Sequence, residues 1–166
     1  MDLDVAIIGA GPYGLSAAAY LKARGQKVAV FGDPMSFWRD HMPAGMFLRS
    51  NWAASHISDP HSKLTLNHFR AESGIQFAQP IPLSNFVAYG EWYQQKAVPD
   101  LYRRQVCRLE KSETGFSVRL DSGETLRTSD MPRVRSVNAT DYRIGHGPRF
   151  RRSNGDRHRC SVGDRA

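Results

Sequence analysis

The most specific chemical signal in the sequence is a trio of glycines near the N-terminus. Gly9, Gly11 and Gly14 follow the spacing G-x-G-x-x-G within "DVAIIGAGPYGLSAAAYLKARG", which holds a dinucleotide when it stands between a strand and a helix. The first glycine permits a tight turn, the second removes a side chain where the pyrophosphate approaches, and the third lets helix and strand pack closely. Free N–H groups at the helix N-terminus then face the phosphate charge. The pattern predicts a dinucleotide site at this turn.

Two neighbours of the glycines and one aspartate complete the predicted nucleotide site. Pro12 and Tyr13 open the predicted helix, where a proline is tolerated because its missing N–H would have no intrahelical partner. The acid that binds ribose hydroxyls normally ends the second strand, but Gly32 stands there and Asp33 comes one residue later. Three alternatives stay open: Asp33 reaches the ribose, the contact is missing, or Gly32 admits the adenosine closely. A missing contact would weaken binding by about 1.5 to 3 kcal/mol.

The elements that must position these residues form a β-α-β unit. Residues 3–8 are an apolar run typical of a strand, residues 13–24 are typical of a helix ended by Gly25, and residues 27–31 supply a second strand. Two strands joined by a helix lie parallel with a right-handed crossover. A glycine-rich turn without a ligand is the alternative, and the matching helix and second strand argue against it. The predicted fold class is α/β, a Rossmann-like domain with a parallel sheet.

The next hundred residues are predicted to cover this sheet. The connection over residues 33–63 is long and rich in Pro, Gly, Ser, His and Trp, so we expect it to wrap a ligand. Ser62 is predicted to cap a helix over residues 63–73, and Ser84 to cap another over residues 85–97. A β-meander follows, with predicted strands at residues 105–112, 116–121 and 124–128.

Length and composition limit the classes of protein to consider. The chain has 166 residues and is 40% hydrophobic, enough for one ordinary domain and too few for two. The apolar runs fall short of the roughly 20 residues of a membrane span, and the first run lacks the basic lead of a signal peptide. We therefore expect a cytoplasmic protein without a membrane partner. His56, His61 and His68 do not follow a metal-ligand spacing, so we expect solvated histidines and assign no metal ligand.

Up to residue 128 the chain resembles the FAD-binding half of the two-dinucleotide-binding-domain flavoproteins, especially the flavin-containing and N-hydroxylating monooxygenases. The resemblance rests on "GAGPYGLSAAAYLKARG", on "FWRDHMPAGMFLRSNWAASHISDP", and on "PIPLSNFVAYGEWYQQ" followed by the meander. It implies FAD at the N-terminal glycines, and NADPH at a second glycine motif that this chain does not contain. It also implies a small-molecule substrate for the intact enzyme. We assign no catalytic side chain, because the flavin would carry the chemistry.

The resemblance also implies further cofactor contacts. Trp38 matches the tryptophan that follows the second strand, residues 48–51 match a segment that passes close to the flavin, and the strand around Val106 lends backbone groups to adenine. The chemistry is compatible, since an aromatic plane can stack while Arg49 and Asn51 offer hydrogen-bond donors.

Each of these assignments has a structural alternative. The tryptophan and the valine can belong to the core. Arg39, which we also assign to the cofactor, and Arg49 can instead be solvated or pair with Asp40 or Asp59, as surface arginines usually do.

The character of the sequence changes after Thr128. Residues 129–166 hold nine Arg, four Asp and no Lys, with few aliphatic residues, and are predicted to form a basic, irregular or disordered tail beside the FAD-binding domain of residues 1–128. In the family, the meander is followed by an apolar strand ending in Ala-Thr-Gly. Here only the dipeptide Ala139-Thr140 matches the end of that strand. We hypothesise that the chain is truncated or frameshifted there, which would leave the fold incomplete and the fragment inactive. Failure to find such a strand in the other reading frames would contradict this.

Other functions remain as alternatives. The net charge of +7 and the arginine-rich tail are compatible with a non-enzymatic nucleotide-binding protein or a basic-tail interaction protein. We do not expect nucleic-acid binding, because Arg149, Arg151 and Arg152 are interleaved with only one aromatic residue, Phe150. A flavoprotein of the disulfide-reductase kind is disfavoured because the sequence contains no C-x-x-C pair. The oligomeric state does not follow from the sequence.

Overall fold

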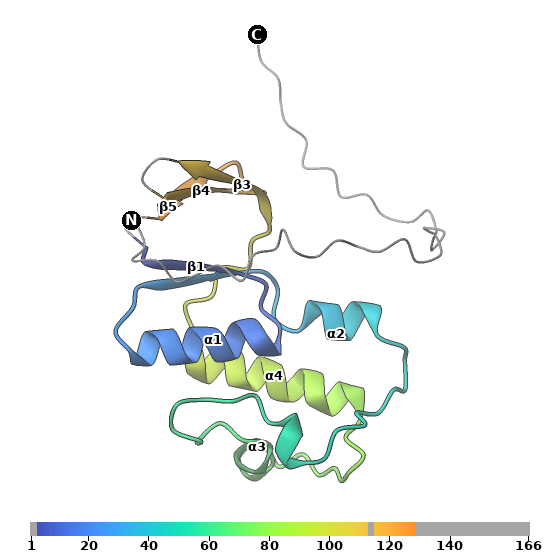
Figure 1. Ribbon diagram of the computed structural model, residues 1–166. Coiled ribbons are helices and arrows are strands. Elements are labelled where there is room, and N and C mark those ends of the chain that lie inside the picture. Colours follow the sequence, from blue (N-terminus) through green and yellow to red (C-terminus); the bar gives the residue numbers. More distant parts are fainter. Residues whose placement is uncertain (1–2, 113–114, 129–166) are drawn as a thin grey trace, which may run out of the picture. The chain divides into compact units, whose positions relative to one another are not determined.

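The computed structural model describes residues 3–112 and 115–128 (Figure 1). These residues form a mixed α/β unit with a parallel pair of strands, four helices and an antiparallel three-stranded sheet. The arginine-rich segment of residues 129–166, and with it the truncation hypothesis, lies outside the described residues. Within the described ranges, no helix combines the length and the apolar character that crossing a membrane requires.

The N-terminal β-α-β unit is present as predicted. It consists of β1 (Val5–Ile8), α1 (Pro12–Ala23) and β2 (Val28–Phe31), and the strands pair in parallel along their whole length. A distant residue, Tyr102, extends the sheet beyond β2. Its N–H donates to the carbonyl of Val30 at 2.9 Å, and its carbonyl accepts from Gly32 N at 3.1 Å. The segment that leads into the meander therefore lies beside the end of β2.

The connection over residues 33–63 contains regular structure that sequence periodicity did not predict. Helix α2 (Ser36–His41) and a 3-10 turn (Ala53–Ser55) lie within it. Both are too short to show a helical period in the sequence.

The helices α3 (Leu66–Ser73) and α4 (Leu83–Ala97) confirm the two predicted helices, but both predicted caps are wrong. Thr65 caps α3, because its Oγ1 accepts a hydrogen bond from His68 N, whereas Ser62 has a left-handed φ of 52°. Helix α4 begins directly after Pro82, one residue before Ser84. The φ of −61° at Pro82 suits the entry into a helix.

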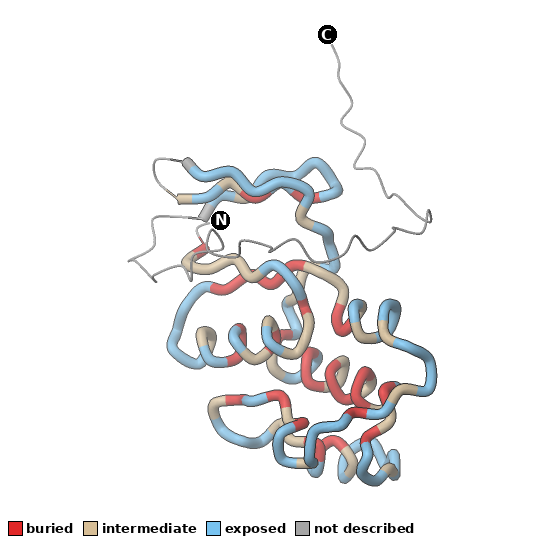
Figure 2. The backbone as a smooth tube through the Cα atoms, turned by 45° about the vertical axis from the view of Figure 1, so that its right-hand side comes forward, coloured by how far each residue is buried: buried red, intermediate tan, exposed pale blue. Residues whose placement is uncertain are grey.

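Helix α4 is the centre of the main core. Its Tyr89 and Tyr93 are fully buried, together with Leu15 of α1 and Met35 ahead of α2, and Figure 2 shows the buried residues concentrated along α4 and β2. A Cβ added at Gly90 would lie 2.4 Å from the Met35 sulfur. The glycine therefore allows the start of α2 to pack directly on α4.

The β-meander is confirmed. It consists of β3 (Val106–Ser112), β4 (Gly115–Leu120) and β5 (Thr125–Thr128), paired antiparallel in the order β3-β4-β5. Val118 and Leu120 of β4 are buried in a second apolar cluster with Leu3, Ala29 and Phe31. The parallel strands thus contribute to two clusters, one shared with the helices and one shared with the meander.

Candidate cofactor site

The three glycines of the G-x-G-x-x-G motif occupy positions with distinct steric requirements. Gly9 has a φ of +111°, which disfavours any residue with a side chain. A Cβ at Gly14 would lie 2.0 Å from the carbonyl oxygen of Gly9, so the helix can approach the strand only without it. A Cβ at Gly11 would have no described atom within 4 Å. The space beside Gly11 is therefore open on the side where a ligand can approach.

The N-terminus of α1 has the donor chemistry that a phosphate requires. Gly11 is the N-cap, Pro12 follows, and the first turn contains neither a capping side chain nor an acid. The first α-helical hydrogen bond runs from Leu15 N to the carbonyl of Gly11 at 3.0 Å. The N–H groups of Tyr13 and Gly14 precede it and have no intrahelical acceptor. Together with the positive end of the helix dipole, these donors fit a pyrophosphate.

The end of β2 packs against the glycine turn at Gly32. This residue has a φ of +129°, and a Cβ there would lie 3.4 Å from the backbone nitrogen of Ala10. Glycine at the usual position of the acid is therefore favoured by its backbone conformation, because a Cβ at 3.4 Å would make only an ordinary van der Waals contact.

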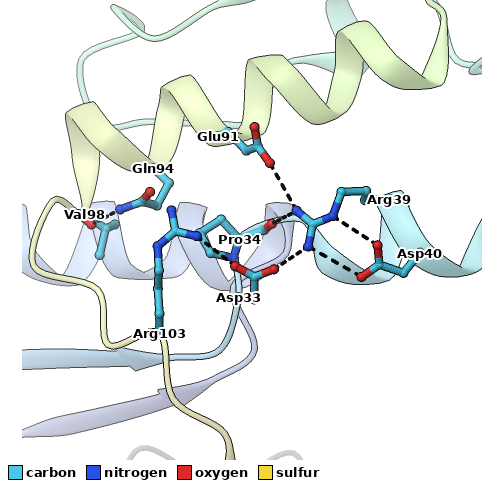
Figure 3. A network of polar contacts seen from close by, with 8 residues as sticks. All are labelled: Asp33, Pro34, Arg39, Asp40, Glu91, Gln94, Val98 and Arg103. Atoms are coloured by element: carbon cyan, nitrogen blue, oxygen red, sulfur yellow. Dashed lines mark hydrogen bonds and ion pairs between the residues drawn. The ribbon is translucent and has the colours of Figure 1, made fainter. Parts of the chain in front are cut away.

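Asp33, the displaced acid, is held by two arginines (Figure 3). Its Oδ1 accepts from Nη1 of Arg103 at 2.8 Å, and its Oδ2 accepts from Nη2 of Arg39. Each carboxylate oxygen can accept more than one hydrogen bond, so Asp33 keeps acceptor capacity while both ion pairs are intact.

Arg39 is the centre of this network. Besides Asp33, its guanidinium contacts Asp40 through Nε at 3.0 Å and Glu91 on α4 through Nη1 at 3.2 Å. Hydrogen bonds to Asp33 and then Asp40 raise the pKa of Arg39 above its ordinary value. The structure therefore shows the alternative in which Arg39 pairs with Asp40. Arg39 links α2 to α4 and to the end of β2.

A cavity of about 540 Å³ adjoins the glycine turn. It brings together four of the predicted site residues: Pro12, Tyr13, Trp38 and Arg49. Its walls are mainly apolar, with a small number of polar side chains among them, which is typical of sites for organic ligands. The remaining lining residues are Met42, Met46, Phe47, Leu48, Ser50, Ala54, Ser55, His56, Ile57 and Phe86.

Trp38 and Arg49 differ in how much they are engaged by the protein. The Trp38 ring packs edge-on against Phe86 with centroids 4.9 Å apart, so it belongs both to the core and to the cavity wall. Arg49 is exposed and forms no ion pair with any described carboxylate. The structure thus shows no pair between Arg49 and Asp59, and it agrees with the alternative of a solvated Arg49.

Asp59 instead organises the loop behind the cavity. Its buried carboxylate accepts from the backbone N–H groups of His61, Lys63 and Leu64 at 3.0, 3.2 and 2.9 Å. Burial opposes its ionisation, but these hydrogen bonds outweigh that effect and lower its pKa. From α4, the hydroxyl of Tyr89 accepts from Ile57 N at 3.0 Å and donates to the carbonyl of Leu64 at 2.6 Å. The loop is thereby fastened to the core.

His56 corrects the expectation of solvated histidines. Its ring is only partly exposed, lines the cavity, and accepts at Nδ1 from Leu66 N, 3.0 Å away at the start of α3. Burial lowers its pKa. Sequence spacing does not reveal this role, because the bond joins a loop to a separate helix. His61 and His68 are exposed, as expected.

Val106 does not join the other predicted residues. It pairs with Leu120 in the meander, packs against the second apolar cluster, and is absent from the cavity wall. Its contact with adenine stays a prediction. Among the described residues, no group of three His, Cys, Asp or Glu side chains is placed to hold a metal ion.

Comparison with solved structures identifies the fold. A bacillithiol disulfide reductase from Staphylococcus aureus superposes with a TM-score of 0.60 at 18% identity, covering 75% of this chain and 36% of that one. A flavin-containing monooxygenase from Stenotrophomonas maltophilia gives a TM-score of 0.58 at 24% identity over 77% and 37% of the two chains. A lysine monooxygenase from Nocardia farcinica gives 0.58 at 17% identity over 75% and 51%.

These likenesses define the fold as the Rossmann-like fold of the FAD-binding part of two-dinucleotide flavoproteins. A further neighbour, OTEMO, was solved in complex with FAD and NADP and has a TM-score of 0.58 at 18% identity. The predicted fold class and the resemblance are confirmed at this level.

Comparison with curated sequences finds thiamine thiazole synthases. The enzyme from Pyrobaculum islandicum is 54% identical over 44 residues, and that from Pyrobaculum aerophilum is 35% identical over 89 residues. The chain spans only 17% and 34% of the lengths of these two relatives. No protein-family model matches the chain.

Proposed function

We propose that this chain is the FAD-binding portion of an NAD(P)H-dependent flavoprotein oxidoreductase, of the monooxygenase kind. The observation that carries the proposal is the continuity between the glycine turn and the cavity. Pro12 and Tyr13 belong to the turn that would hold the pyrophosphate, and they also line the cavity that Trp38 and Arg49 share. One ligand with a phosphate part and a flat ring part would fill both, and FAD has this composition.

The charges at the end of β2 favour a ribose without a 2′-phosphate. The three carboxylates of Asp33, Asp40 and Glu91 face the two guanidinium groups of Arg39 and Arg103, so these five side chains carry one net negative charge. In this fold an acid near the end of the second strand binds the ribose hydroxyl, whereas an arginine receives the 2′-phosphate of NADP. Because both arginines are already paired with acids, the site suits the free ribose of FAD better than that of NADPH.

Within the cavity, the chain would bind and orient the ring system of the cofactor. Trp38 provides an aromatic wall and Arg49 provides a cation that is not neutralised by a described acid. The flavin, when bound, would supply the redox chemistry. NADPH and a small-molecule substrate belong to the intact enzyme, because the chain spans about a third of several similar flavoproteins. We propose a cytoplasmic location without nucleic-acid or membrane partners, and this fragment alone would be inactive.

Two other functions compete with this proposal. The likeness to the bacillithiol disulfide reductase favours a reductase. The absence of a C-x-x-C pair from this sequence counts against that function. A non-enzymatic nucleotide-binding protein would use the same glycine turn without turnover.

The test is a titration of the purified chain with FAD, followed by flavin fluorescence and visible absorbance. We expect a yellow protein with one FAD per chain, and much weaker binding of NADP⁺ measured by competition. A folded chain that stays colourless with excess FAD would contradict FAD binding. Oxidation of NADPH by the chain alone, above the rate with free flavin, would contradict the expected inactivity of the fragment.

A further inference from the structure

His56 connects the cavity wall to helix α3. Its Nδ1 accepts a hydrogen bond from Leu66 N at 3.0 Å. Because a backbone N–H can only donate, Nδ1 carries no proton, and in the neutral ring the proton must be on Nε2. Burial lowers the pKa of His56, in agreement with a neutral ring. The fold thus selects one tautomer and turns Nε2 into a donor.

The backbone on both sides of His56 is held in place. On one side, Ser55 Oγ donates to the carbonyl of Asn51 at 2.8 Å. On the other side, the N–H of Ile57 donates to the buried hydroxyl of Tyr89 at 3.0 Å. The position of the imidazole is therefore set by the core and by α3, as binding residues require.

The two serine hydroxyls of the cavity wall have no proton left to donate to a ligand. Ser55 gives its hydroxyl proton to Asn51, so in the contact between Ser50 Oγ and Ser55 Oγ at 2.8 Å Ser50 is the donor. Both hydroxyl protons are used within the protein. Among the described residues, Nε2 of His56 has no hydrogen-bond partner, and it is not one of the buried unsatisfied atoms. His56 is thus, with Arg49, Tyr13 and Trp38, one of the side chains of this wall whose donors have no described partner.

The geometry points to His56 as a ligand-positioning residue that donates its Nε2–H to an acceptor atom of the flavin ring system. This inference rests on the proposed function, since it names a residue of the same site. The ligand class it requires is a flat heteroaromatic ring with carbonyl or ring-nitrogen acceptors along one edge, which the flavin provides. A purely apolar ring in the cavity would leave this donor without an acceptor.

Two substitutions distinguish the role of the Nδ1 acceptor of His56 from the role of its Nε2 donor. In His56→Asn the amide oxygen replaces the Nδ1 acceptor for Leu66 N–H but the donor at Nε2 is lost, whereas His56→Gln places an amide donor near Nε2 and loses the acceptor. We expect His56→Asn to keep the melting temperature while its Kd for FAD rises about 10-fold, the weight of one hydrogen bond. We expect His56→Gln to melt lower and to keep an affinity closer to that of the wild type. His61→Asn, at an exposed histidine outside the cavity, is the matched control and should change neither property.

Nuclear magnetic resonance gives a readout that does not depend on a variant folding. A long-range proton–nitrogen spectrum of the wild-type chain at pH 7 should show His56 as the Nε2–H tautomer, with Nε2 shifting when FAD is added. An Nδ1–H tautomer, a protonated ring, or an unchanged Nε2 in the FAD complex would overturn the inference. So would a folded His56→Asn variant with wild-type affinity. If the folded wild type binds no FAD, the proposed function fails, and this inference fails with it.

Discussion

Replacing Gly11 by alanine separates the binding role of the glycine turn from its folding role. At Gly11 the backbone has φ −79° and ψ −179°, which an alanine adopts without strain, and its Cβ would meet no described atom within 4 Å. The weaker N-cap preference of alanine costs up to about 1 kcal/mol, and the lower entropy of the unfolded chain offsets about 0.4–1 kcal/mol of this. The free energy of unfolding should therefore change little.

Binding should change much more, because the added methyl group occupies the space beside the turn where we place the pyrophosphate. We expect the Kd for FAD to rise at least about 10-fold, which corresponds to about 1.4 kcal/mol. Flavin fluorescence titration measures the Kd, and urea unfolding measures the stability. Gly14→Ala is the contrasting variant, since its Cβ would lie 2.0 Å from a backbone oxygen and should lower stability itself.

Two results would refute this reasoning. If Gly11→Ala binds FAD as tightly as the wild type, the pyrophosphate does not lie beside Gly11. If Gly11→Ala unfolds as readily as Gly14→Ala, the space beside Gly11 is not open to a methyl group in the folded protein.

The remaining predictions concern the ribose end, the loop behind the cavity and the effect of pH. Asp33→Asn should weaken FAD binding several-fold and improve the relative binding of NADP⁺, measured by competition, because it frees Arg39 and Arg103 from their shared acid; unchanged selectivity would contradict the charge argument. Tyr89→Phe should lower the free energy of unfolding by about 1–3 kcal/mol in urea, because it leaves the backbone N–H of Ile57 without its acceptor; a variant as stable as the wild type would show that water replaces the hydroxyl. The lowered pKa of His56 means that below about pH 6.5 the unfolded chain binds a proton that the folded chain resists. Stability should therefore fall as pH drops from 6.5 through the folded pKa, and His56→Asn should remove this part of the pH dependence of urea unfolding.

Local sequence patterns predicted those parts of the fold that depend on neighbouring residues. The apolar runs of β1 and β2, the glycine spacing and the alternation in β4 each act within a few residues of one another, and the structure has each element where the pattern indicated it. The errors occurred where the pattern was too short or the partner was distant. Helix α2 has only six residues, and the start of α4 depended on Pro82 rather than on the capping serine nearby.

The sequence by itself determined the Rossmann-like class, because the tight turn at Gly9 and the close packing of the helix on the strand at Gly14 depend on residues that are near neighbours in the chain. Only the tertiary structure decided how the acid after β2 is used, since Arg103 is 70 positions away from Asp33. It also decided the tautomer of His56, which depends on a helix that begins ten residues later. Covalent neighbours set backbone conformation, whereas the charge and proton position of a side chain are set by whichever distant groups the fold brings within hydrogen-bond distance.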